Sequence, residues 1–196
     1  VEPSFQQWLF ALPVANSFDS SINIISTLSA NTIRRKVNGV AGTAPLGQSE
    51  CVGYNEGKDT DIEYIRSGIT EFFNGQDYST QASEPLDHPD PNIISGRTNV
   101  SLTFALHYCE RLQREGFKRV ELIPCGYGAT SFSGGDWIKG GARYNYARDK
   151  VAQFINFDEI NFLNEIILSI GQSDADAGVT ESEMTDYLVD FATDFR

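Results

Sequence analysis

The sequence predicts an α/β fold in which a parallel sheet is covered by helices on both faces. Between residues 37 and 196, apolar runs typical of strands alternate with patterns typical of helices, an order that favours parallel strands joined by helical crossovers. The strand-like runs cover residues 37–47, 120–124 and 165–170, and the helical patterns cover residues 98–115, 142–156 and the segment after Thr180.

The first part of this region gives the weaker signals. Residues 37–47 contain valine and alanine in a strand-like order, although glycines and a proline interrupt it. Residues 53–97 are rich in Gly, Asn, Asp and Pro, so we expect mostly loop, with a brief element within residues 62–72. In residues 98–115 apolar side chains recur on one helical face, and Gly116 is a natural helix stop.

The second part is clearer. Residues 120–124 read as a short buried strand that runs into a glycine-rich turn, and a helix is expected over residues 142–156. Thr180 and Glu183 have the spacing of a capping box, which marks the start of a helix. The apolar stripe that follows at helical spacing is expected to be core: Met184, Tyr187, Leu188, Phe191 and Phe195.

These patterns divide the chain into an N-terminal arm, residues 1–36, and an α/β domain, residues 37–196. The arm holds an apolar cluster between Phe5 and Leu12, and we expect it either to cover one edge of the sheet or to belong to a neighbouring module. A length of 196 residues suits one domain, and 40% hydrophobic residues are enough for a packed core.

Composition excludes some classes of function. With 27 acidic and 15 basic residues the formal net charge is −12, which argues against nucleic acid as a partner, because phosphate binding depends on clustered Lys and Arg. No apolar run reaches the roughly 18 residues that a membrane span needs. The three cysteines form no Cys-x-x-Cys pair, and we expect buried structural thiols rather than a metal or redox site.

Two short motifs follow strand-like runs: Gly47-Gln48-Ser49-Glu50 and Gly171-Gln172-Ser173-Asp174. In open α/β sheets, ligand sites form at the carboxyl ends of the strands. A serine held there on a sharp turn is a candidate nucleophile, which makes Ser49 the first catalytic candidate. The alternative interpretation is two ordinary turns, because glycine and serine are common turn residues.

Another motif, Gly126-x-Gly128, follows the strand expected at residues 120–124. In chain order, the first motif is therefore Gly47-Gln48-Ser49-Glu50, the second is Gly126-x-Gly128, and the third is Gly171-Gln172-Ser173-Asp174. A dinucleotide site is not favoured, because Ser131 stands where the third glycine is required and residues 132–141 are not expected to open a helix. Backbone N–H groups at such a turn can instead stabilise a developing oxyanion.

A serine nucleophile needs a general base, and the chain offers two histidines. His107 falls in an amphipathic helical pattern and is expected to be a surface or packing residue. His88 lies in a proline-rich loop between Asp87 and Asp90, and we expect a solvated loop histidine, with a weak general base or a metal ligand as the alternatives. Two histidines so far apart give no pattern of metal ligands, so no metal is expected.

Taken in order, these motifs resemble the SGNH/GDSL hydrolase superfamily, specifically its sialate O-acetylesterase-like carbohydrate esterase branch. The likeness rests on Gly47-Gln48-Ser49, on residues 122–131 leading towards Trp137, and on Gly171-Gln172-Ser173-Asp174-Ala175. Residues 85–89 and 104–105 also resemble that branch. The likeness covers residues 40–196 and does not reach residues 1–36.

The resemblance implies a three-layer α/β/α sandwich and a serine esterase that removes acetyl groups from carbohydrate without a cofactor. Ser49 is then the nucleophile, and the oxyanion hole consists of the Ser49 N–H, the Gly128 N–H and a side chain of the third motif. The corresponding position is Gln172 or Ser173, and we expect Gln172, whose amide can donate, although the branch more often has Glu there. Gln48, Ser173 and Asp174 are expected to support the site, with Asp174 holding a loop rather than doing chemistry.

The sequence departs from the branch in two ways. Glu50 stands where the branch usually has Asn, and the late Asp-x-x-His block that supplies the base is absent. We therefore expect an N-terminal portion of a longer enzyme, because the last helix is followed by no strand and leaves an apolar sheet edge open. Two alternatives are that a second chain supplies Asp and His, or that the site is inactive.

The expected partner is an acetylated carbohydrate, and the expected setting is extracellular or virion-associated. The alternative function is a non-catalytic carbohydrate-binding or structural module, such as part of a viral tail or cell-surface protein, on an esterase-like scaffold. Residues 1–36 and the missing base motivate this alternative.

Overall fold

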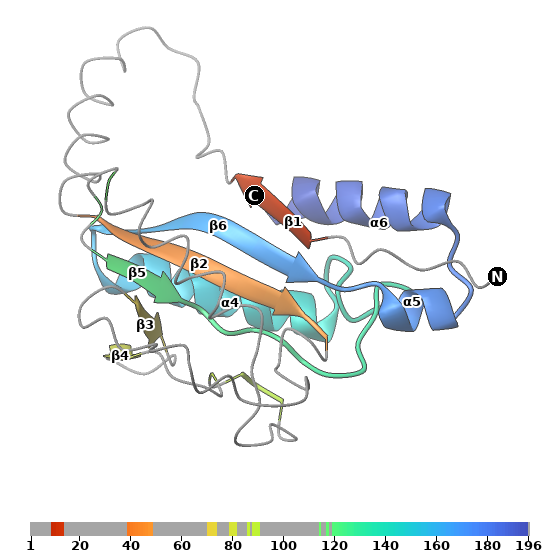
Figure 1. Ribbon diagram of the computed structural model, residues 1–196, viewed down its shortest axis with the longest axis horizontal. Coiled ribbons are helices and arrows are strands. Elements are labelled where there is room, and N and C mark those ends of the chain that lie inside the picture. The colour runs from red at the N-terminus through yellow and green to blue at the C-terminus, as the bar shows by residue number, and fades with distance from the viewer. Residues whose placement is uncertain are drawn as a thin grey trace, which may run out of the picture.

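The fold is built on a six-stranded sheet with the order β1-β6-β2-β5-β3-β4 (Figure 1). The computed structural model describes residues 9–13, 39–48, 70–73, 79–81, 86, 88–90, 114, 117 and 119–195. Its strands are β1 (Leu9–Pro13), β2 (Val40–Gly47), β3 (Thr70–Phe73), β4 (Ser79–Gln81), β5 (Arg119–Leu122) and β6 (Asn161–Ser169). Strands β6, β2, β5 and β3 run parallel, whereas β1 and β4 pair antiparallel at the two edges.

The parallel pairing expected from the sequence is confirmed for the inner strands β6, β2, β5 and β3, whereas the two edge strands are antiparallel. Strand β2 is one of the inner strands. All eight residues of β2 are buried, because β6 and β5 flank the strand and α4 packs across it. The contact with α4 requires small residues in β2, because a side chain at Gly42 would overlap the ring of Phe154 from α4. The pairing of β2 with β6 contains an irregularity between Gly42 and Thr43, where the partner shifts from Leu163 to Glu165.

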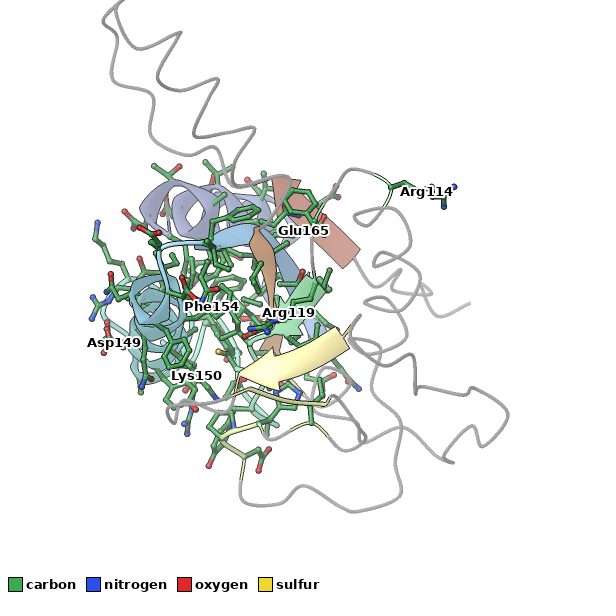
Figure 2. The ribbon with its side chains drawn as sticks, turned by 90° about the vertical axis from the view of Figure 1, so that its left-hand side faces the viewer. Arg114, Arg119, Asp149, Lys150, Phe154 and Glu165 are labelled. Atoms are coloured by element: carbon green, nitrogen blue, oxygen red, sulfur yellow. The ribbon has the colours of Figure 1, made fainter. Side chains whose placement is uncertain are left out.

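Helices α4 (Ala142–Phe157) and α6 (Glu181–Asp194) share one face of the sheet. Figure 2 shows Phe154 between α4 and the strands, with Asp149 on the outer side of the helix. The hydroxyl of Tyr144 donates to the carbonyl of Asp194 at 2.8 Å, which ties the two helices together. Aromatic rings fill the space between them: Phe132, Tyr144, Tyr187, Phe191 and Phe195.

The opposite face of the sheet carries a smaller apolar cluster of Ala41, Phe117, Val120 and Phe162. The helix expected over residues 98–115 lies outside the described residues, except for Arg114, which is helical. The described part of the chain therefore establishes an α/β fold with helices on one face.

Several local expectations are confirmed. Helix α4 agrees with the expected span within one residue, and α6 begins with the capping box of Thr180 and Glu183. The apolar stripe of α6 packs on the core as expected. The last strand begins at Asn161, four residues earlier than expected, and β3 falls at the end of the brief element expected in residues 62–72.

The expectation of an open sheet edge is wrong. Strand β1 pairs with β6 from Leu9 opposite Ser169 to Pro13 opposite Glu165, so part of the N-terminal arm is an edge strand. The backbone of β6 on this side is therefore paired with β1 rather than open. Within the described residues, no helix is both long and apolar enough to cross a membrane.

Candidate functional site

Three segments meet at the carboxyl edge of the sheet, where β2 and β6 end side by side and the chain continues past the end of β5, which stops opposite Thr43 (Figure 1). The segment after β5 continues along β2, because the N–H of Cys125 donates to the Pro45 carbonyl (3.0 Å) and that of Tyr127 to the Gly47 carbonyl (2.8 Å). On the other side, the Gln48 N–H donates to the Ser169 carbonyl of β6 at 3.0 Å. Since β2 lies between β5 and β6, its motif is flanked by the other two.

Gly47 fits this junction because it has no side chain. Its φ of 137° is one that other residues rarely adopt, and a Cβ there would overlap the carbonyl of Ser169. The glycine of the first motif thus allows β2 to pass β6 closely before the chain reaches Ser49.

The Gln48 side chain, only 4% exposed, joins all three motifs. We orient its amide so that the nitrogen donates to the Thr130 carbonyl (2.9 Å) and to Ser173 Oγ (3.0 Å), while the oxygen accepts from the Gln172 N–H (3.0 Å). This orientation satisfies both ends of a buried amide. Gln48 is therefore a buried link between the turns that the sequence singled out.

Asp174 joins the third motif to the loop that follows the second. Its carboxylate is 1% exposed and accepts from the N–H groups of Phe132 (3.2 Å) and Ser133 (2.8 Å). A buried carboxylate that accepts from two backbone N–H groups holds the loop in place. This geometry corresponds to the loop-holding role expected for Asp174.

Hydrogen bonds of Thr130 and Trp137 hold the turn of the second motif, which follows β5. The indole N–H of the fully buried Trp137 donates to Thr130 Oγ1 at 2.9 Å, and that hydroxyl donates to the Tyr127 carbonyl at 2.7 Å. Between these residues, Ala129 has a left-handed φ of 55°. The guanidinium of Arg143 lies over the Tyr127 ring, 3.3 Å from its centre, which adds a cation–π contact to the same turn.

His88 is buried, contrary to the expectation of a solvated loop histidine. It is 4% exposed, and its Nδ1 accepts from the Gly126 N–H at 2.8 Å. The ring proton therefore sits on Nε2, for which the described residues offer no hydrogen-bond partner. The Thr43 hydroxyl is also buried without a hydrogen-bond partner among the described residues, but Thr43 lies within β2 rather than beyond the strand ends.

The environment keeps His88 neutral. Burial, and next the charge of Lys150, lower the pKa of His88 from 6.5 to about 3, and the opposing effect of Asp90 is smaller. Lys150 is itself buried on α4 and donates to the Pro124 carbonyl at 3.3 Å (Figure 2). Asp90 acts on His88 in the direction of a higher pKa, but burial and the charge of Lys150 outweigh it. A histidine with its free lone pair already engaged and a pKa of about 3 is a poor general base.

Asp90 lies at the same turn, in a contact that its sequence neighbours did not indicate. Its carboxylate is 3% exposed and accepts from the Gly128 N–H at 2.6 Å. The donor that the resemblance assigns to an oxyanion is thus engaged by a carboxylate. The spacing His88-x-Asp90 was an available signal, because residues two apart lie on the same side of an extended segment.

Other expected site residues are placed only in part. Ser49, Glu50, Asp87 and His107 lie outside the described residues. Gln172 begins the short helix α5 (Gln172–Asp176) with an exposed side chain, which makes no hydrogen bond to the described part of the chain. Among the described residues, no group of three or more His, Cys, Asp or Glu side chains is placed to hold a metal ion.

Comparison with known proteins supports the fold alone. No protein-family model and no curated protein sequence matches the chain. The structure is similar to that of a protein from Arabidopsis thaliana solved by X-ray crystallography, with a TM-score of 0.62 and 16% sequence identity. The match covers 79% of this chain and 68% of the Arabidopsis chain.

Proposed function

We propose that this chain carries the nucleophile of a serine ester hydrolase that removes O-acetyl groups from carbohydrate. The observation that supports the proposal is the convergence of three motif segments on Gln48, the residue before Ser49. Ligand sites form at this edge of parallel sheets. The resemblance of the same three segments to the SGNH/GDSL hydrolases supplies the reaction, and it also implies a third layer of helices on the face opposite α4.

In the proposed reaction, the Ser49 hydroxyl attacks the acetyl carbonyl carbon and gives its proton to a general base. Donors from the Ser49 N–H, from the turn at residues 126–130 and from the Gln172 amide stabilise the negative oxygen of the tetrahedral intermediate. The bond to the sugar oxygen then breaks, and that oxygen receives the proton. Water hydrolyses the acetyl–Ser49 ester by the same route and releases acetate.

The base is assigned to a histidine outside this sequence, oriented by an aspartate, in the rest of the polypeptide or in a second chain. His88 does not fit the role, because its Nδ1 is engaged and its pKa is about 3. The proposed reaction needs no cofactor. The proposed substrate is an uncharged ester that needs no cationic surface for binding, in keeping with the net charge of −12. An extracellular or virion setting, where acetylated carbohydrates are accessible, is part of the proposal.

The test is the hydrolysis of an aryl acetate by the complete polypeptide with Ser49→Ala. We expect kcat/KM to fall by at least about a thousandfold, because the nucleophile is lost while binding remains. Ser182→Ala, on the exposed side of α6, is the matched control and should leave the rate unchanged. Equal rates for Ser49→Ala and the control would contradict the assignment.

A second candidate function is a non-catalytic carbohydrate-binding module on the same scaffold. It is favoured by one observation: His88, the one histidine in the described part of the chain, is buried and neutral. Binding of acetylated glycans more tightly than deacetylated ones, with no acetate released, would support this candidate over the esterase.

A further inference from the structure

The turn after β5 is held from both sides by alternate backbone N–H groups. The N–H groups of Cys125 and Tyr127 donate to carbonyls of β2, at Pro45 and Gly47. Those of Gly126 and Gly128 face the other side, where a parallel strand would offer further carbonyls. There, the His88 and Asp90 side chains accept in their place, at 2.8 and 2.6 Å.

His88 and Asp90 therefore replace a neighbouring strand. They are 4% and 3% exposed, so water competes little for these two hydrogen bonds. A carboxylate acceptor strengthens the bond to Gly128, and the short distance agrees with a charge-assisted hydrogen bond. Because the N–H groups of all four residues are engaged, residues 125–128 are fixed relative to β2.

Two backbone N–H groups of this turn are not engaged by the described residues. From Cys125 to Asp136, each N–H has an acceptor among the described residues except those of Ala129 and Thr130. Thr130 is buried, whereas Ala129 is exposed and has a φ of 55°. Successive N–H groups beside a left-handed residue can point to one side and bind an anionic oxygen.

The left-handed conformation of Ala129 is a second sign of function at this point. A residue other than glycine in this conformation costs about 1–2 kcal/mol, and it persists only where surrounding contacts enforce it. The contacts are present on both sides: Asp90 holds Gly128, and the Trp137–Thr130–Tyr127 chain of hydrogen bonds holds the residue that follows Ala129.

We propose that His88 and Asp90 are positioning residues that fix Gly126 and Gly128, and thereby present the Ala129 N–H to the acetyl oxygen as the donor of this turn. The inference rests on the proposed esterase function and changes one of its donors from Gly128 to Ala129. Asp90 is not a competitor of the substrate in this arrangement, because the N–H that it engages is not the one that the oxyanion uses.

The first experiment is kinetic and uses the complete polypeptide with an aryl acetate. Asp90→Ala removes the acceptor of the Gly128 N–H, and we expect kcat to fall about tenfold to a hundredfold with little change in KM, since a misplaced oxyanion donor weakens the transition state. Asp90→Asn keeps an oxygen acceptor and should recover most of the rate. Asp190→Ala, on the exposed side of α6, is the matched control.

His88 is tested in the same way. The side-chain oxygen of asparagine can occupy the position of Nδ1, so His88→Asn should retain more activity than His88→Ala. An increase in kcat for Asp90→Ala would overturn the proposal, because it would mean that Asp90 blocks the working donor. Equal kcat for Asp90→Ala and the wild type would overturn it as well.

The second experiment is amide hydrogen exchange with 15N-labelled protein, which needs no catalysis. Gly126 and Gly128 should exchange slowly and Ala129 rapidly, and Asp90→Ala should remove the protection of Gly128. Acetate, the product of the proposed reaction, should shift the Ala129 amide resonance more than that of Gly128. A larger shift at Gly128, or no shift at Ala129, would contradict the proposal even if Ser49→Ala had confirmed the esterase.

Discussion

The structure around His88 decides between two roles that its sequence neighbours allow. A histidine between aspartates can be a solvated base with a raised pKa, or it can be a buried hydrogen-bond acceptor. The structure has the second arrangement, with Nδ1 on the Gly126 N–H and Lys150 near enough to oppose a positive ring. Burial acts on the pKa of His88 more strongly than Asp90 does, so the ring is neutral over the ordinary pH range.

This environment predicts a loss of stability in acid. The pKa of His88 is about 3 in the folded protein and about 6.5 in the unfolded chain, so below pH 6.5 the unfolded state binds a proton that the folded state does not. The contribution of His88 to stability is therefore present above pH 6.5 and declines by about 1.4 kcal/mol per pH unit as the pH falls towards 3. Between pH 7.5 and 4.5 the expected loss is about 2–3 kcal/mol.

The measurement is urea unfolding at both pH values for the wild type and for His88→Asn, which keeps an acceptor but cannot be protonated in this range. The free energy of unfolding of His88→Asn should fall less between pH 7.5 and 4.5 than that of the wild type. The same pH dependence for both proteins would show that the His88 ring is accessible to protons in the folded state.

The positions of some residues at the site could be predicted from the sequence, and those of others could not. Gly47 and Gln48 lie at the end of β2, and Asp174 lies in the short helix that follows β6, so their place at the carboxyl edge follows from local pattern and general sheet geometry. Asp90 lies in a long segment without strand pattern, and its contact with Gly128 spans 38 positions. Nothing in the local sequence fixes such a contact, because it depends on how a distant segment packs against the sheet.

Helix α6 illustrates an element that local chemistry defines almost completely. Glu183 accepts from the Thr180 N–H at 2.8 Å, and the Thr180 hydroxyl accepts from the Glu183 N–H at 3.3 Å. The hydrogen bonds from Thr180, backbone first, lower the pKa of Glu183. The apolar stripe then faces Phe132 and Tyr144, so both the start and the buried face of α6 were readable from spacing.

For this element we predict that Thr180→Ala destabilises the protein by about 1 kcal/mol, the usual effect of losing an N-cap hydroxyl. The free energy of unfolding from urea denaturation measures it. Thr185→Ala is the control on the same helix: its hydroxyl donates to a carbonyl one turn earlier, and its removal should change stability by less than about 0.5 kcal/mol. A loss for Thr180→Ala no larger than that of the control would contradict the capping role.

The short strands show the limit of element-level prediction. β3 and β4 have only four and three residues, too few for a reliable period, and β1 lies in an arm with no turn signal to place it. Their strand character depends on the backbone partners that β5, β3 and β6 provide. Strands of this kind are defined by pairing rather than by their own sequence.

For the whole molecule, the order β6-β2-β5 matters most, because it places the motif after β2 between the other two. The alternation of strands and helices was enough to predict parallel strands, and therefore a common edge for the motifs. It did not predict which strands are neighbours, nor which edge of the sheet the N-terminal arm covers, although covering one edge was one of its two expected roles. These features depend on contacts between distant segments, which a single sequence does not encode in any local pattern.

The convergence of three motifs supports the proposal that Ser49 is an activated nucleophile. A fluorophosphonate forms a covalent bond with activated serines, so treatment of the complete polypeptide with this reagent, followed by peptide mass spectrometry, tests the proposal. We predict that the label is found on the peptide that contains Ser49 and is absent from Ser49→Ala. Acetate release by a protein whose Ser49 stays unlabelled, or a label on another residue that persists in Ser49→Ala, would contradict it.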